Sequence, residues 1–192
     1  MQLSKNIKIR DFLQYKFLNS IFTGLAMGSV FTIYGSLEPS IFSIGGIFLA
    51  IGLLIVAKSY TKILNINSFY RISLGVEVVM FLMVGYFLLN PYNYTTALLV
   101  YIGYQISFMF GSYLVRAETV FLNRMQILSF LDVTKQKGYL VGLALSYLFY
   151  KALELVGTTD NKLQVYDLHY GLFVLQIAII YFLYKAFITK KI

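Results

Sequence analysis

Glu77 is the one acidic or basic side chain in the apolar stretch 72–90, and its chemistry is the first question that the sequence raises. An ionisable group inside a bilayer is costly, so such residues are usually functional. Arg116 falls at a comparable depth at the end of another apolar stretch, and Glu118 lies just beyond it. We therefore favour a Glu77–Arg116 ion pair that acts as a structural or gating clasp. Two other roles for Glu77 stay open: coupling of a proton or substrate, and extension of its side chain to water.

Four polar aromatic and amide side chains could line a cavity for a small solute. Tyr101 and Gln105 are one helical turn apart and share a face of the apolar stretch 96–115. Tyr104 lies beside them, and Tyr34 stands near the end of the first apolar stretch. These residues predict either a solute-binding lining or hydrogen bonds between neighbouring helices, and both interpretations are open.

The residue types needed for most enzyme and metal chemistry are missing or scattered. The chain has no Cys, which excludes disulfides and cysteine-based metal sites, and its single histidine, His169, is predicted at the outer edge of the last apolar stretch. Its eight carboxylates form no paired-aspartate motif, and no Gly-rich phosphate loop is present. We therefore expect no enzyme activity, no cofactor and no bound metal.

Membrane-spanning helices are the elements that must position these side chains. Hydrophobic residues make up 59% of the 192 residues and charged residues only 12%, well below the charged share of soluble domains. A transmembrane helix needs about 20 mostly apolar residues. The sequence predicts one all-α transmembrane domain over residues 1–192 with six spans: 17–35, 40–57, 72–90, 96–115, 138–157 and 170–189.

The basic residues predict how these spans are oriented. Segment 116–137 mixes apolar and charged residues, which predicts a short amphipathic helix on the cytoplasmic membrane surface. With the amino terminus in the cytoplasm, only Lys151 and Lys162 of the 16 lysines and arginines fall outside. This positive-inside bias predicts an integral protein of a bacterial inner membrane with both termini cytoplasmic. It also accounts for the net charge of +8 without a nucleic-acid partner.

Small residues predict where the helices approach one another most closely. Gly138, Gly142 and Ser146 line one face of their helix, and Gly24 and Gly28 are one turn apart on another. The pair Gly24 and Gly28 could join two copies of the chain. We expect instead that it serves a crossing within the six-helix bundle, which is the more common use.

The pattern of spans and loops resembles one half of a major facilitator superfamily transporter. In that family the loop between spans two and three carries a Gly-x-x-x-Asp-Arg/Lys signature, and the matching stretch here is 57–62. Only the basic Lys62 is kept, because Ala57 and Thr61 stand at the Gly and Asp positions. The resemblance implies two inverted three-helix repeats and a substrate cavity between two six-helix halves. A homodimer or another six-helix chain would supply the second half.

Two functions are therefore expected from different classes of membrane protein. The first is a small secondary transporter or transporter half, with a cavity lined by the four polar residues above and coupling or gating through Glu77, Arg116 and Glu118. The second is a non-transporting accessory or assembly protein. Its basic segment 116–137 would dock a partner protein or anionic lipid.

Overall fold

The computed structural model describes residues 7–187, which form helices joined by short turns and contain no strand. The all-α class predicted from the sequence is confirmed for this part of the chain. The helices are α1 (Ile9–Tyr34), α2 (Pro39–Lys58), α3 (Tyr60–Ile63), α4 (Ile66–Leu89), α5 (Tyr94–Met109), α6 (Gly111–Leu122), α7 (Met125–Leu155) and α8 (Asn161–Phe187).

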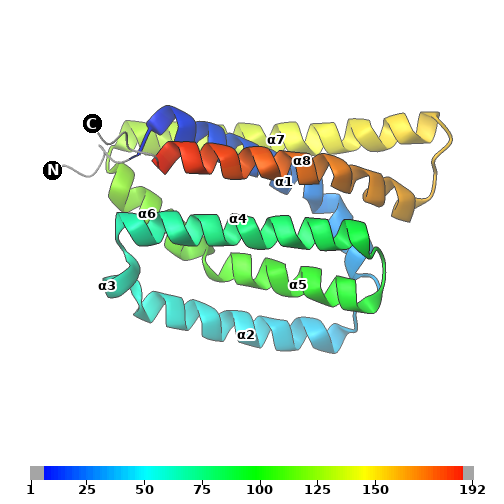
Figure 1. The fold of residues 1–192 in the computed structure, drawn as a ribbon, viewed down its shortest axis with the longest axis horizontal. Coiled ribbons are helices and arrows are strands. Elements are labelled where there is room, and N and C mark those ends of the chain that lie inside the picture. The colour runs from blue at the N-terminus through cyan, green and yellow to red at the C-terminus, as the bar shows by residue number, and fades with distance from the viewer. Residues whose placement is uncertain (1–6, 188–192) are drawn as a thin grey trace.

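The long helices lie side by side in two groups (Figure 1). Helix α1 packs mainly against α7 and α8, and α4 packs against α8 and α5. Helix α2 packs mainly on α5 and buries few of its own residues. The start of α1 meets the end of α8, where the backbone N–H of Lys8 donates to the carbonyl of Ala186 at 2.9 Å. The two ends of the described chain therefore lie at the same end of the bundle (Figure 1).

Within residues 7–187, five segments are long and apolar enough to cross a membrane. They are α1, α2, α4, α8 and the stretch Tyr94–Leu122, which combines α5 and α6. These helices are compatible with an integral membrane protein. Helix α7, which contains the predicted span 138–157, does not join this set, because Lys151 and Glu154 interrupt its apolar half. The sixth span thus remains a prediction.

Several helices begin earlier than the apolar stretches alone predict. Helix α1 begins at Ile9 because Phe12 and Tyr15 are buried in the core of the bundle. Helix α8 begins at Asn161, which places His169 inside the helix and buries it, rather than leaving it at the outer edge. The last two residues of the predicted span 170–189 lie outside the described residues.

The segment 116–137 does not form the separate surface helix that its amphipathic pattern predicts. Its first part belongs to α6 and its second part to α7, and the chain turns between them at Asn123, which adopts the left-handed conformation (φ 35°) that Asn tolerates. Phe121 and Leu131 from this segment are buried in the protein core. Its apolar residues therefore partly serve internal packing, which hydropathy cannot distinguish from contact with lipid.

Small residues join α1 to α7 in the most extensive helix contact of the described chain. Gly142 lies against Gly24 and the Ile21 carbonyl, and Gly138 lies against the Phe17 carbonyl. The close crossing expected for Gly24 is therefore present, whereas Gly28 has no neighbour where its side chain would be. Because residue numbers rise together along the contact, α1 and α7 run parallel.

Candidate functional site

The Glu77 carboxylate lies at the centre of a buried hydrogen-bond network. Glu77 is 2% exposed and is the twelfth residue of the 24-residue helix α4. One carboxylate oxygen accepts from the Tyr15 hydroxyl at 2.8 Å and from the Asn19 amide at 2.9 Å. The other accepts from the Gln176 amide at 2.7 Å. Two helices, α1 and α8, thus supply the donors that a buried carboxylate on α4 requires.

Helix geometry explains how these donors meet. Tyr15 and Asn19 are one turn apart on α1, so both face α4. Gln176 on α8 is fully buried, and its amide nitrogen also donates to the backbone carbonyl of Glu77 at 3.0 Å. The network therefore fixes the Glu77 side chain and joins α1, α4 and α8 near the middle of the bundle.

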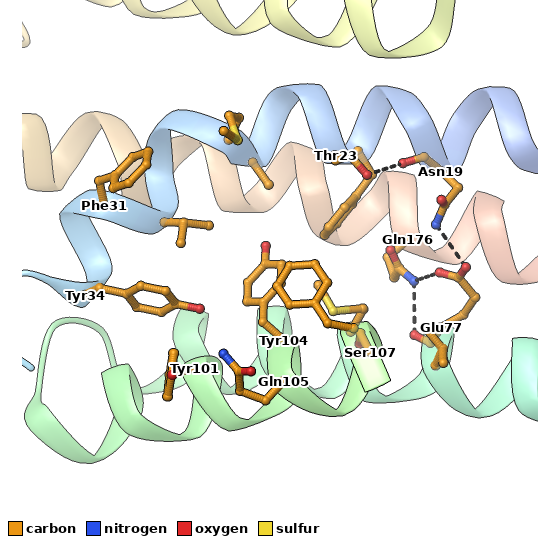
Figure 2. A pocket seen from close by; sticks show the side chains of 17 residues that line it. Asn19, Thr23, Phe31, Tyr34, Glu77, Tyr101, Tyr104, Gln105, Ser107 and Gln176 are labelled. Atoms are coloured by element: carbon orange, nitrogen blue, oxygen red, sulfur yellow. Dashed lines mark hydrogen bonds between the residues drawn. The ribbon is translucent and has the colours of Figure 1, made fainter. Parts of the chain in front are cut away.

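A cavity of about 300 Å³ borders this network (Figure 2). Asn19, Glu77 and Gln176 lie at one end of it, and Tyr34 lies at the other end. The remaining lining comes mostly from apolar side chains of α1 and α5. The volume lies at the lower end of the range for small-molecule pockets.

Five of the seven residues predicted to line a solute cavity or to act in coupling or gating border the same cavity, and Arg116 and Glu118 do not. The five are Tyr34, Glu77, Tyr101, Tyr104 and Gln105. Tyr34 comes from the carboxyl end of α1 and Glu77 from α4, and the other three residues come from α5. The structure brings these sequence-predicted residues together, and whether a solute binds them stays a prediction.

The tyrosines at the Tyr34 end form an aromatic cluster. The Tyr34 ring meets Tyr101 edge to face at 5.5 Å between centroids and Tyr104 at 6.5 Å. Tyr101 also packs on Phe42 of α2 at 5.3 Å and donates its hydroxyl to the Phe42 carbonyl at 3.3 Å. Gln105 lies beside this cluster, and its buried amide oxygen has no hydrogen-bond partner in the described chain.

The Glu77–Arg116 ion pair predicted from the sequence is absent from residues 7–187. Arg116 is exposed on α6, whereas Glu118, two residues later, faces the interior. Glu118 binds Lys16 of α1 at 2.6 Å and Lys135 of α7 at 2.5 Å. A clasp therefore exists, but Glu118 forms it. Arg116 does not pair with Glu77 because the Arg116 side chain is exposed on α6, whereas Glu77 is buried inside the bundle.

Sequence reasoning missed the three donors that hold Glu77. Asn19 and Gln176 each sit within a predicted apolar span, and amides there usually bond to a neighbouring helix. That rule could have selected them as partners of Glu77. Tyr15 lies just before the predicted first span, so no sequence signal placed it at this depth.

Two other polar features lie away from the cavity. Lys151 and Glu154 pair with each other at 2.7 Å on an exposed face of α7. The His169 ring bonds through Nδ1 to the Val165 carbonyl at 2.7 Å and packs on Phe87. Both have sufficient structural explanations.

Comparisons with known protein families, with curated proteins and with solved structures find no match to this chain. Its function must therefore be argued from its own residues.

Proposed function

We propose that this chain is a small secondary transporter, or a transporter half, that moves a small solute through the cavity beside Glu77. The observation that carries the proposal is the buried Glu77 carboxylate, halfway along a membrane-length helix and at the edge of a cavity. Transporter sites lie near the bilayer midplane, where ionisable residues mark substrate and ion pathways.

The topology proposed with this function has six spans. The meeting of α1 and α8 at the end that holds both ends of the described chain supports an even number of crossings. Helix α7 runs parallel to α1 and packs on it closely, which supports α7 as the sixth span of the proposal. The basic residues at the shared end support its cytoplasmic placement in an inner membrane. Exposed ones at that end include Arg10, Lys58, Arg71, Arg116 and Arg124.

A second copy of the chain is part of the proposal. On one side of the cavity, three lining residues are apolar and exposed at the protein surface: Met27, Phe31 and Phe108. A second six-helix unit at that side would enclose a pathway, as the resemblance to half of a major facilitator transporter implies. A homodimer is the simplest form, and the inverted three-helix repeat belongs to the same proposal.

The test is solute uptake by proteoliposomes that contain the wild-type chain or Glu77→Gln. We expect wild-type uptake of at least one solute from a radiolabelled panel of sugars, amino acids, carboxylates and amines. Glu77→Gln is expected to reduce proton-driven uptake by at least tenfold, because Gln keeps the shape but carries no titratable proton.

The control variant is Glu154→Gln, which removes an exposed carboxylate of α7 far from the cavity lining. It should transport like the wild type, and both variants should keep the wild-type thermal unfolding temperature in detergent. Equal uptake by Glu77→Gln and wild type would exclude a coupling role for Glu77. Absence of uptake across the whole panel would count against transport.

The accessory function remains the second candidate because the corner between α6 and α7 presents exposed basic residues. Arg116, Arg124 and Lys137 are exposed there, whereas Lys135 is engaged by Glu118. If this corner docks a protein or anionic lipid, Arg124→Glu combined with Lys137→Glu should remove a co-purifying partner without changing solute flux. Lys162→Glu, at the opposite end of the bundle, is the matched charge reversal and should retain the partner.

A further inference from the structure

Two amide oxygens and one carboxylate that border the cavity are hydrogen-bond acceptors. The Gln176 amide gives its nitrogen to Glu77, and its oxygen is buried without a partner in the described chain. The Gln105 amide oxygen is also buried without a hydrogen-bond partner in the described chain. Together with the Glu77 carboxylate, these oxygens create a negative potential along the cavity. A ligand that donates hydrogen bonds or carries positive charge would satisfy them.

No protein cation lies within ion-pair distance of Glu77 in residues 7–187. Lys16 of α1 acts on Glu77 only through space, because its ammonium group pairs with Glu118 at 2.6 Å and lies over the Tyr15 ring at 4.9 Å. Glu118 thus holds two lysines while Glu77 holds only neutral donors. A buried carboxylate without a positive partner is unfavourable, so a cationic ligand would gain from it.

Aromatic rings surround the other end of the cavity. The Tyr34 ring lies nearly at right angles to the rings of Tyr101 and Tyr104, and the Tyr104 ring is 5.9 Å from the Phe108 ring between centroids. The face of an aromatic ring is negative, and groups of such rings bind quaternary ammonium ions. Figure 2 shows the Tyr34 and Tyr104 side chains turned toward the same space.

The rim of the cavity is apolar and faces outward. Phe31 is 72% exposed and Phe108 57%, and Met27 lies beside them in the lining. These residues are in membrane-length segments, so their exposed surfaces meet an apolar neighbour, either acyl chains or the second copy proposed above, rather than water. The apolar body of a ligand would therefore lie on this side of the cavity.

We propose that the cavity binds an amphipathic organic cation, an ammonium group on a small apolar body. The ammonium lies among the tyrosine rings and beside the unpartnered Gln105 amide oxygen, the Glu77 carboxylate attracts it through space from the other end of the cavity, and the apolar body lies toward the rim. This inference deepens the proposed function and rests on it for the movement of the ligand, although binding can be measured alone. Anions are disfavoured because Glu77 would repel them.

The test measures binding of radiolabelled phenyltrimethylammonium to the purified full chain in maltoside micelles by equilibrium dialysis, corrected with protein-free micelles. The competitor is tert-butylbenzene, which has the same shape and no charge. We expect saturable binding at one site per chain, with competition by tert-butylbenzene at least tenfold weaker than self-competition, as a cation–π and charge contribution requires.

Variants identify the groups responsible. Glu77→Gln should weaken phenyltrimethylammonium binding by about tenfold, and Tyr34→Leu should weaken it several-fold through loss of a ring face. Tyr181→Leu removes an exposed tyrosine of α8 that does not line the cavity and should bind like wild type. If Glu77→Gln fails to fold, Tyr34→Leu and the competition on the wild-type chain still decide the question.

The outcomes separate the ligand class from the transport function. Equal competition by the neutral compound, no saturable binding, or wild-type affinity in a folded Glu77→Gln would each overturn the cation proposal. Saturable cation binding with no uptake of any solute would support the ligand class and reject transport. Uptake of other solutes without cation binding would reject the ligand class and leave transport standing.

Discussion

Replacing Glu118 with Leu is expected to lower the free energy of unfolding by about 3–5 kcal/mol, because it strands buried charge. Lys16 and Glu118 are 8% and 4% exposed at the side chain, and Lys135 binds the second carboxylate oxygen. These residues come from α1, α6 and α7, so loss of the carboxylate loosens three helices together. Unfolding by dodecyl sulfate in mixed micelles measures the effect.

Two further variants test the cause of that loss. Lys16→Met combined with Glu118→Leu should recover much of the stability, because replacing a buried pair with apolar residues is often neutral. Glu154→Leu breaks the exposed Lys151–Glu154 pair of α7 and should change stability little, since exposed pairs contribute little. A Glu118→Leu effect as small as that of Glu154→Leu would contradict a stabilising role for the cluster.

Hydropathy predicted most of the fold because the long apolar runs that form its helices are visible in the local composition of the sequence. The span predicted at 40–57 falls within α2, the span predicted at 72–90 ends one residue beyond α4, and the all-α class holds for the described residues. The extension of α1 to Ile9 could not be predicted this way, because it depends on Phe12 and Tyr15 meeting α4 and α8. Such contacts join residues far apart in the chain.

The candidate site could be predicted in part for a related reason. Spacing placed Tyr101 and Gln105 on one face of a helix, and the structure turns that face toward Tyr34. Rotation of a helix about its axis is set by its neighbours, and hydropathy does not contain it. Arg116 and Glu118 illustrate this point. They are only two positions apart on α6, yet the Arg116 side chain is exposed and the Glu118 side chain is buried.

Gly142→Leu is expected to destabilise the protein by about 3 kcal/mol, because overpacking forces backbone to move. A Cβ atom at Gly142 would overlap the Ile21 carbonyl and lie 3.0 Å from the Gly24 Cα. These atoms belong to the backbone of α1 and cannot rotate aside as a flexible side chain can. Helix α7 must then separate from α1, and the Ser146 bond to the Leu25 carbonyl at 3.4 Å is lost with it.

Gly28→Leu is the matched control, since it makes the same chemical change where no atom lies within 4 Å of the new Cβ. Its free energy of unfolding should equal that of the wild type or be slightly higher, because Leu has a higher helix propensity than Gly. Native mass spectrometry of both variants adds a second readout against the 22.0 kDa chain mass. Equal destabilisation by the two substitutions would contradict an α1–α7 crossing built on Gly24 and Gly142. Conversion of a two-chain particle to single chains by Gly28→Leu alone would assign the exposed Gly28 face to the interface between copies.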